Sequence, residues 1–220
     1  MLMSAKANEL MQAIHGADVY AGYGSVLPLD LQGWNSAHQV FDEIISNDRP
    51  PVIIDVGVWK GGSTIFMANL VRENGGDGVI VAIDTFLGSP EHWDRTGQWG
   101  NLILRKNGRP LLYEQFLTNV LRTGFQDLII PLPQTSENAA AILMHLGISA
   151  KLIHIDAAHE YEAVMRDIRL YWNLLGSGGY LIGDDYDPRW PGVVRAANEF
   201  AESIGQPLTI SEPKWLIKKQ

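Results

Sequence analysis

Three aspartates stand where two apolar stretches of the chain end, and these residue types are well suited to binding a cation. Asp156 follows the mostly apolar residues 151–155, and Asp184 and Asp185 follow the mostly apolar residues 180–183. If both stretches are neighbouring parallel strands, their carboxyl ends converge on one crevice. Carboxylates held together repel one another unless a cation or protons compensate. Oxygen ligands of this kind suit Mg²⁺, so the sequence predicts a magnesium site built from the three aspartates.

His159 lies three residues after Asp156 and can take a proton. An unperturbed imidazole has a pKa of about 6.5, so it can act as a base at neutral pH. A bound cation would lower this pKa and keep the ring neutral. The alternative for Asp156 and His159 is a structural role, because each stands where it can cap the helix expected at residues 160–175. His92 and Lys60 are weaker candidates for the base.

A glycine-rich turn between an expected strand and an expected helix is a second feature that could bind a ligand. Gly57 ends the apolar strand at residues 52–56, and Gly61 lets the backbone turn sharply where a ligand comes close. A dinucleotide loop needs a glycine where this chain has Trp59, and a phosphate-binding P-loop needs a lysine where it has Ser63. What remains is the pattern D-x-G-x-x-x-G-x-S. The alternative is a strand, a turn and a helix that only pack together.

Asp84 ends the next expected strand, at residues 79–84, beside the glycine turn in a parallel sheet. A carboxylate there can accept hydrogen bonds from both hydroxyls of a ribose. The alternative is that Asp84 caps a helix or a turn. Residues 85–109 then form a connection that is too long for an ordinary βα loop, and such loops are often functional. We expect Trp93 and Trp99 of this loop to close over an apolar or sugar-like ligand.

Strands alternate with helices along the chain, which predicts an α/β fold with a doubly wound, mostly parallel sheet and helices on both faces. The short connection through Glu212 and Pro213 requires the last two of seven strands to pair antiparallel. Ser36 begins an S-x-x-Q capping box for the second helix, and residues 177–179 form a turn. We expect strands at residues 52–56, 79–84, 128–132, 151–156, 180–184, 208–211 and 214–218. We expect helices at residues 1–15, 36–45, 63–71, 111–122, 136–145, 160–175 and 192–204.

The length and composition indicate one globular domain. A chain of 220 residues can form one well-packed α/β domain and is short for two. The formal charge of −8 argues against nucleic acid as a partner, since phosphates require clustered lysine and arginine. The chain has no cysteine, which excludes disulfides and thiolate metal sites and fits the cytoplasm. We expect no signal peptide and no membrane partner, and the oligomeric state stays open, a homo-oligomer included.

Two longer stretches resemble metal-dependent small-molecule O-methyltransferases. They are D-A-A-H-E-Y-E at residues 156–162 and G-G-Y-L-I-G-D-D-Y at residues 178–186, which W-P-G-V at residues 190–193 follows. The glycine turn resembles the cofactor loop of class I S-adenosylmethionine-dependent methyltransferases. Two branches are similar, the macrocin and cephalosporin-cluster enzymes and the catechol type. The macrocin type often has an aspartate where this chain has Ala158, and the catechol type has a lysine where it has His159.

This resemblance covers residues 51–193 and implies a Rossmann-like methyltransferase fold that ends in an antiparallel strand pair. It implies one methyltransferase domain, with an N-terminal helix and a possible lid at residues 1–34 and a Rossmann-like core at residues 35–220. It also implies that residues 134–136 hold the adenine ring of S-adenosylmethionine. The full set of implied cofactor-binding residues is Asp55, Gly57, Trp59, Lys60, Gly61, Ser63, Asp84, Thr85, Thr135, Ser136 and Asp156.

The sequence therefore predicts a magnesium-assisted transfer of a methyl group from S-adenosylmethionine to a hydroxyl of a small molecule, such as a sugar, a polyketide or a phenol. His159 and Asp156 would be the catalytic residues. Two alternatives stay open. A cofactor-binding protein without catalysis would explain Ala158, and a nicotinamide-dependent oxidoreductase would share the fold, although Trp59 disfavours it.

Overall fold

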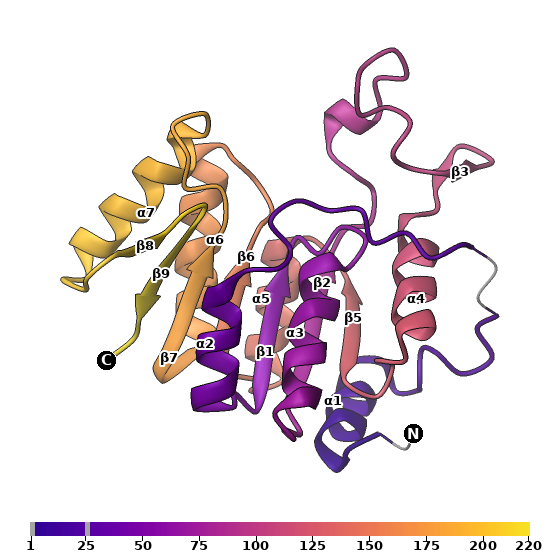
Figure 1. Cartoon of the computed structure of the whole chain (residues 1–220), viewed down its shortest axis with the longest axis horizontal. Coiled ribbons are helices and arrows are strands. Elements are labelled where there is room, and N and C mark those ends of the chain that lie inside the picture. The colour runs from indigo at the N-terminus through magenta and orange to yellow at the C-terminus, as the bar shows by residue number, and fades with distance from the viewer. Residues whose placement is uncertain (1–2, 25–26) are drawn as a thin grey trace.

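The main feature of the computed structural model, which describes residues 3–24 and 27–220, is a seven-stranded sheet (Figure 1). Its strands are β1 (Val52–Val56), β2 (Val79–Asp84), β5 (Ile129–Pro133), β6 (Ala150–Ile155), β7 (Leu175–Gly183), β8 (Thr209–Ser211) and β9 (Lys214–Lys218). They lie in the order β5-β2-β1-β6-β7-β9-β8. Neighbours from β5 to β7 pair in parallel, whereas β9 runs antiparallel to β7 and β8. The predicted fold class, with its reversed C-terminal strand pair, is confirmed.

Helices cover both faces of this sheet. They are α1 (Ala5–His15), α2 (Gln39–Asp48), α3 (Gly62–Glu73), α4 (Leu112–Thr123), α5 (Ser136–His145), α6 (Tyr161–Leu174) and α7 (Pro191–Ser203). Helices α2 and α3 lie side by side on one face, whereas α5 and α6 lie on the other, with α7 packed on α6 (Figure 1). Strand β7 is longer than predicted, because residues 177–179 continue the strand and its register with β6 shifts there.

The central strands are apolar because both of their faces are covered. All five residues of β1 are buried, and Ile53 and Ile54 have no exposed surface. Burying one such side chain contributes about 1.5–3 kcal/mol to folding. Asp55 is the polar exception, and its carboxylate accepts hydrogen bonds from the hydroxyls of Ser63 and Thr64 at 2.9 and 2.6 Å. These bonds satisfy the buried carboxylate and tie β1 to the first turn of α3.

Two helices begin elsewhere than the sequence predicted. Helix α2 begins at Gln39 rather than Ser36, and its N-cap is His38, whose Nδ1 accepts a hydrogen bond from the backbone N–H of Val40 at 3.3 Å. The Ser36 hydroxyl lies against the glycine turn instead, since a Cβ built on Gly62 would be 2.5 Å from its Oγ. Helix α3 begins at Gly62, ahead of the hydroxyl residues that the sequence suggested. In both places the hydroxyl side chain that the local pattern assigned to a helix cap makes a tertiary contact instead: Ser36 lies against Gly62, and Ser63 and Thr64 bond to Asp55.

Two segments rise over the carboxyl edge of the sheet. Residues 27–38 cross above the ends of β1 and β2, in dark purple at the centre of Figure 1. Residues 85–111 carry the short 3₁₀ helix η1 (Pro90–His92) and a two-stranded hairpin of β3 (Arg105–Lys106) and β4 (Arg109–Pro110). This loop extends beyond the rest of the molecule (Figure 1). Both segments are therefore placed to border a ligand at the carboxyl ends of the strands.

The N-terminal helix lies at the β5 edge of the sheet. Helix α1 covers residues 5–15 of the helix expected at residues 1–15, and residues 1 and 2 lie outside the described part of the chain. The Tyr20 hydroxyl donates a hydrogen bond to the carbonyl of Ile129 at 2.9 Å, which ties this region to β5. The division into a lid segment and a core stays a prediction. Within the described ranges, no helix combines the length and the apolar character needed to cross a membrane.

Candidate active site

A cavity of about 560 Å³ opens at the carboxyl ends of the parallel strands. Its wall is formed by the glycine turn, the ends of β2, β6 and β7, the loop of residues 85–111 and the N-terminal segment. It brings together nine of the predicted site residues, namely Gly57, Trp59, Asp84, Thr85, Ser136, Asp156, His159, Asp184 and Asp185. Its wall also contains Trp190 of the W-P-G-V stretch and residues that the sequence did not single out, among them Trp34, Asn35 and Arg189.

The glycine turn packs tightly against the end of β6. Gly57 has φ of 85°, and a Cβ there would lie 1.9 Å from the carbonyl oxygen of Asp156. Only glycine fits this position, so the turn keeps the ends of β1 and β6 together. The backbone N–H of Trp59 donates a hydrogen bond to Asp84 at 2.9 Å, and that of Phe86 donates one at 2.7 Å. Burial raises the pKa of Asp84, and these two donors fix its carboxylate at the cavity wall.

Five residues that the sequence assigned to cofactor binding do not line the cavity. Asp55 and Ser63 bond to each other beneath the turn, and both side chains are buried. Lys60 forms a salt bridge of 2.7 Å with an aspartate of the N-terminal segment. The side chain of Thr135 caps α5, and Gly61 is the left-handed N-cap residue just before α3. In this structure these residues support the turn and the neighbouring helices, and their role in cofactor binding stays a prediction.

The three aspartates reach the same edge of the sheet but turn to different partners. No hydrogen bond reaches the Asp156 carboxylate among the described residues, and burial, followed by the charge of Asp184, raises its pKa well above the ordinary value. Asp184 accepts a hydrogen bond from Lys214 Nζ at 2.7 Å. Asp185, in a left-handed conformation with φ of 59°, places a carboxylate oxygen 2.8 Å from His159 Nε2. Thus only one of the three carboxylates faces the cavity without a partner.

Two overlapping groups in the described part of the chain have ligand atoms within 4.8 Å of one another. One consists of Asp156, His159 and Asp185, and the other of His154, Asp156 and Asp184. The trio of aspartates predicted from the sequence is not such a group by itself. Asp156 and Asp185 still fit a magnesium ion, because Mg²⁺ takes one or two protein carboxylates and keeps several waters. The bare Asp156 carboxylate is the observation that favours a cation there.

His159 is held in place from two sides. Its Nε2 meets Asp185, and its ring stacks on Trp190 with centroids 4.0 Å apart. The lowering of the His159 pKa expected from a bound cation stays a prediction, whereas in this structure the hydrogen bond to Asp185 raises it. The reason is that the nearest charge in this structure is a carboxylate. Neighbouring Asp185 therefore orients the ring and strengthens its basicity.

Aromatic side chains cover part of the cavity. Trp34, from the N-terminal segment, lies edge-on to Trp99 with centroids 5.5 Å apart, and Trp59 stacks on His92 at 4.4 Å. The expectation that Trp99 would face the ligand site agrees with its place in the wall. Trp93 does not line the cavity, because its indole N–H donates a hydrogen bond to a backbone carbonyl of its own loop at 3.0 Å. No pattern in the sequence pointed to Trp34.

A buried carboxylic acid beside the cavity gives a stability prediction. Asp167 of α6 accepts a hydrogen bond from the hydroxyl of Ser136, and burial raises its pKa from 3.8 to about 6. The folded state therefore holds this proton more tightly than the unfolded chain, so this favourable contribution is complete below pH 4 and is lost as the pH rises through about 6. We expect Asp167→Asn to stabilise the protein above pH 7 by up to about 3 kcal/mol.

Thermal melts of the wild type and Asp167→Asn between pH 4.5 and 8 measure this effect. The asparagine keeps an acceptor for the Ser136 hydroxyl, so the comparison isolates the charge. The difference in Tm should grow as the pH rises. A constant difference across this range would contradict the assignment.

The sheet order, the glycine turn after the first strand and the acidic strand ends together define the class I methyltransferase fold. A profile described as a methyltransferase domain matches residues 54–186. The chain belongs to this methyltransferase family, and the resemblance seen in the sequence is confirmed.

Individual proteins agree with this assignment. The uncharacterized protein R132 of Acanthamoeba polyphaga mimivirus is 28% identical over 155 residues, which span 69% of this chain and 59% of that protein. The chain thus matches less than two thirds of the length of this relative.

Solved structures of O-methyltransferases share the fold. The Bacillus cereus enzyme, in complex with SAH, superposes with a TM-score of 0.58 at 16% identity, over 100% of this chain and 93% of that one. The calicheamicin methyltransferase CalS11 superposes with a TM-score of 0.60 at 18% identity, over 99% of this chain and 94% of that one. TomG of Streptomyces achromogenes is an O-methyltransferase involved in tomaymycin synthesis and was solved in complex with SAM. It superposes with a TM-score of 0.53 at 15% identity, over 99% of this chain and 91% of that one. At identities this low, the superpositions show a shared fold alone.

Proposed function

We propose that this protein transfers the methyl group of S-adenosylmethionine to a hydroxyl oxygen of a small molecule. One observation carries the proposal: a single cavity has Asp84 on its β2 side and Asp156, His159 and Asp185 on its β6 and β7 side. The TomG and Bacillus cereus enzymes with the same fold were solved with SAM and SAH, which supports this cofactor. The cofactor supplies a methyl group on a positively charged sulfur. The methyl–sulfur bond breaks as a methyl–oxygen bond forms, and the acceptor's proton goes to a base.

Residues at the ends of β1, β2 and β5 would bind the cofactor. Asp84, held by two backbone N–H groups, would accept hydrogen bonds from the ribose hydroxyls. Thr85 and Ser136 line the same cavity and would border the adenine ring. Gly57 leaves the backbone open to close approach at the end of β1.

His159 would take the acceptor's proton. Its Nε2 lies 2.8 Å from Asp185, so the ring is oriented toward the acidic end of the cavity. An acceptor hydroxyl that enters between His159 and Asp156 would replace the contact with Asp185. General-base assistance of this kind is worth about 10²–10⁴-fold in rate. Alignment of the two reactants in one cavity would supply a further large part of the acceleration.

Magnesium assistance belongs to the same proposal. Asp156 and Asp185 would hold the ion, with Asp184 beside them. When bound, Mg²⁺ would lower the pKa of the acceptor hydroxyl and orient it. The support is the Asp156 carboxylate, which has no hydrogen-bond partner among the described residues and whose pKa is raised by burial and then by repulsion from Asp184.

The acceptor would be a planar or sugar-like molecule. Trp34, Trp99 and Trp190 lie in the wall of the cavity, and large aromatic faces stack on such rings. Sugars, polyketides and phenols all present hydroxyls on rings of this kind. A lid within residues 1–34, a homo-oligomer and a cytoplasmic location stay predictions from the sequence.

Binding of the cofactor tests the proposal directly. We expect the protein to bind S-adenosylhomocysteine and not NAD, and Asp84→Ala to weaken that binding by about 1.5–3 kcal/mol, because hydrogen bonds to a charged group are lost. Titration calorimetry measures both affinities. Asp77→Ala removes an exposed aspartate from the turn before the same strand and serves as the control.

Two outcomes would contradict this prediction. Tight binding of NAD without a response to S-adenosylhomocysteine would favour the oxidoreductase. Binding of S-adenosylhomocysteine without any transfer of label from S-adenosylmethionine to a panel of hydroxylated sugars and phenols would favour a binding protein without catalysis.

A further inference from the structure

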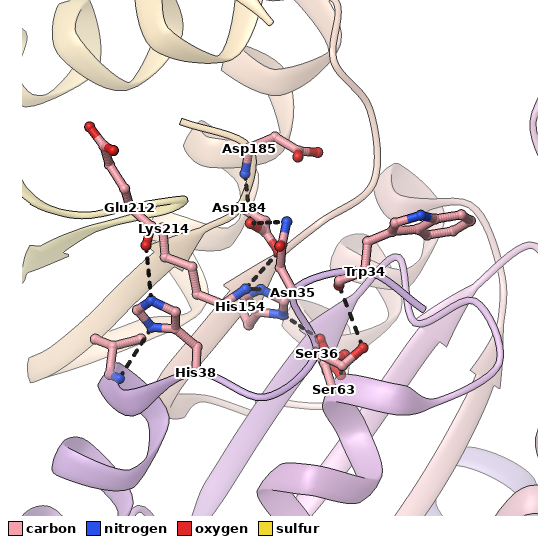
Figure 2. Close-up of polar contacts among 12 residues, drawn as sticks. Trp34, Asn35, Ser36, His38, Ser63, His154, Asp184, Asp185, Glu212 and Lys214 are labelled. Atoms are coloured by element: carbon pink, nitrogen blue, oxygen red, sulfur yellow. Dashed lines mark hydrogen bonds and ion pairs between the residues drawn. The ribbon is translucent and has the colours of Figure 1, made fainter. Parts of the chain in front are cut away.

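A lysine lies fully buried beneath the acidic end of the cavity. Lys214, the first residue of β9, has no exposed surface. Its Nζ lies 2.7 Å from Asp184 Oδ2 and 3.2 Å from His154 Nε2, as Figure 2 shows. The remaining direction is occupied by the ring of Phe41, whose centroid is 5.0 Å away. The ammonium group therefore contacts a carboxylate, an imidazole nitrogen and an aromatic face.

The hydrogen-bond geometry is satisfied by a charged Lys214 beside a neutral His154. His154 is fully buried, and its Nδ1 lies 2.7 Å from Asp55 Oδ1. In the tautomer that carries the proton on Nδ1, this N–H donates to the carboxylate and Nε2 accepts from the Lys214 ammonium. Asp55 is in turn satisfied by two hydroxyls of α3. Lys214 is thus the cation that neutralises Asp184, and His154 links the pair to the base of the glycine turn.

Asp184 connects Lys214 to the residues of the cavity wall. Its second oxygen accepts a hydrogen bond from the backbone N–H of Asp185 at 2.8 Å and faces the amide of Asn35 at 3.5 Å. Asp185 adopts a left-handed conformation that few residues other than glycine favour. The bond from its own N–H holds that conformation and so directs the Asp185 carboxylate to His159. Figure 2 shows this succession from the lysine to the two aspartates.

Stability alone does not account for this arrangement. Burying an ion pair costs desolvation that its attraction often fails to offset, and well-packed apolar residues usually serve as well. A fixed carboxylate next to the cavity, however, requires a fixed counter-charge. We propose that Lys214 is a positioning residue for methyl transfer: it holds Asp184, and through Asp184 it holds Asp185 against His159. This inference rests on the proposed function.

Four variants separate positioning from simple charge balance. Lys214→Met removes the ammonium and keeps an unbranched side chain, and Lys214→Arg keeps the charge. The double variant Lys214→Met with Asp184→Asn leaves no buried charge unpaired, so it keeps the fold if the single variant loses it. Lys218→Met is the matched control, because Lys218 is an exposed lysine at the other end of β9.

Three measurements apply to all variants: hydrogen exchange at residues 33–36 and 184–187, calorimetry with S-adenosylhomocysteine, and kcat with the best acceptor of the labelled-methyl panel. We expect faster exchange at both segments and a kcat lower by about 10–100-fold in Lys214→Met and in the double variant. The affinity for S-adenosylhomocysteine should stay within about threefold, since Asp84 and the turn are untouched. Lys214→Arg should recover part of kcat, and Lys218→Met should match the wild type.

The outcomes that overturn the inference are distinct from a failure of the proposed function. A double variant with the kcat and the exchange of the wild type would show that Lys214 only balances charge. Unchanged hydrogen exchange at residues 184–187 in Lys214→Met and in the double variant would equally refute the positioning role. If the wild type transfers no methyl group at all, the proposed function fails, whereas the exchange data still decide whether Lys214 orders Asp185.

Discussion

Replacing His159 with alanine is expected to lower kcat by about 10²–10⁴-fold, which is the usual contribution of a general base. The expectation rests on the position of Nε2, 2.8 Å from Asp185 in the wall of the cavity, and on the stacking of the ring on Trp190. Neither contact involves the glycine turn, so the affinity for S-adenosylhomocysteine should change little. Initial rates with labelled S-adenosylmethionine, together with calorimetry, measure both quantities.

Two further histidines control this experiment. His145→Ala removes an exposed histidine at the end of α5 and should leave the rate unchanged. His92→Ala removes a histidine of the cavity wall that stacks on Trp59. If His92→Ala abolished the reaction while His159→Ala kept its rate, the base would be His92. Full activity of both variants would leave the proton to a metal-bound acceptor alone.

Removal of divalent cations should lower the rate by at least about 100-fold, since a metal that polarises the acceptor contributes several kcal/mol. Asp156→Asn should give a similar loss, because it removes a carboxylate of the acidic cluster that has no hydrogen-bond partner within residues 3–24 and 27–220. Dialysis against a chelator, followed by titration with Mg²⁺, measures the requirement. The rate should return with added Mg²⁺ in the wild type and should need much more of it in Asp156→Asn.

The control for the metal experiment is Asp77→Asn, an exposed aspartate in the turn before β2. Full turnover of the wild type in excess chelator would refute the metal part of the proposal and leave methyl transfer itself standing. A double variant Asp156→Asn with Asp185→Asn that keeps the normal rate would refute it as well.

Strand and helix positions were largely readable from local patterns. The bounds of β1, β2 and α5 agree with those expected, because strands that are covered on both faces are nearly continuous apolar runs and Thr135 forms an ordinary cap. The reversed C-terminal pair followed from the shortness of its connection. The predicted start of α2 was wrong, because Ser36 lies against Gly62 and His38 caps the helix.

The candidate site divides in the same way. Local patterns were enough to predict that Asp84, Asp156, Asp184 and Asp185 reach one edge of the sheet, because each stands at the end of a parallel strand and such strands end together. It could not determine the partner of each carboxylate, since a hydrogen bond depends on side chains from distant elements. Only the tertiary structure placed Lys214 on Asp184 and turned Asp185 toward His159. A lysine that begins a strand is ordinarily exposed, so its burial is decided by the packing of β9 against β7 and α2, which no local pattern contains.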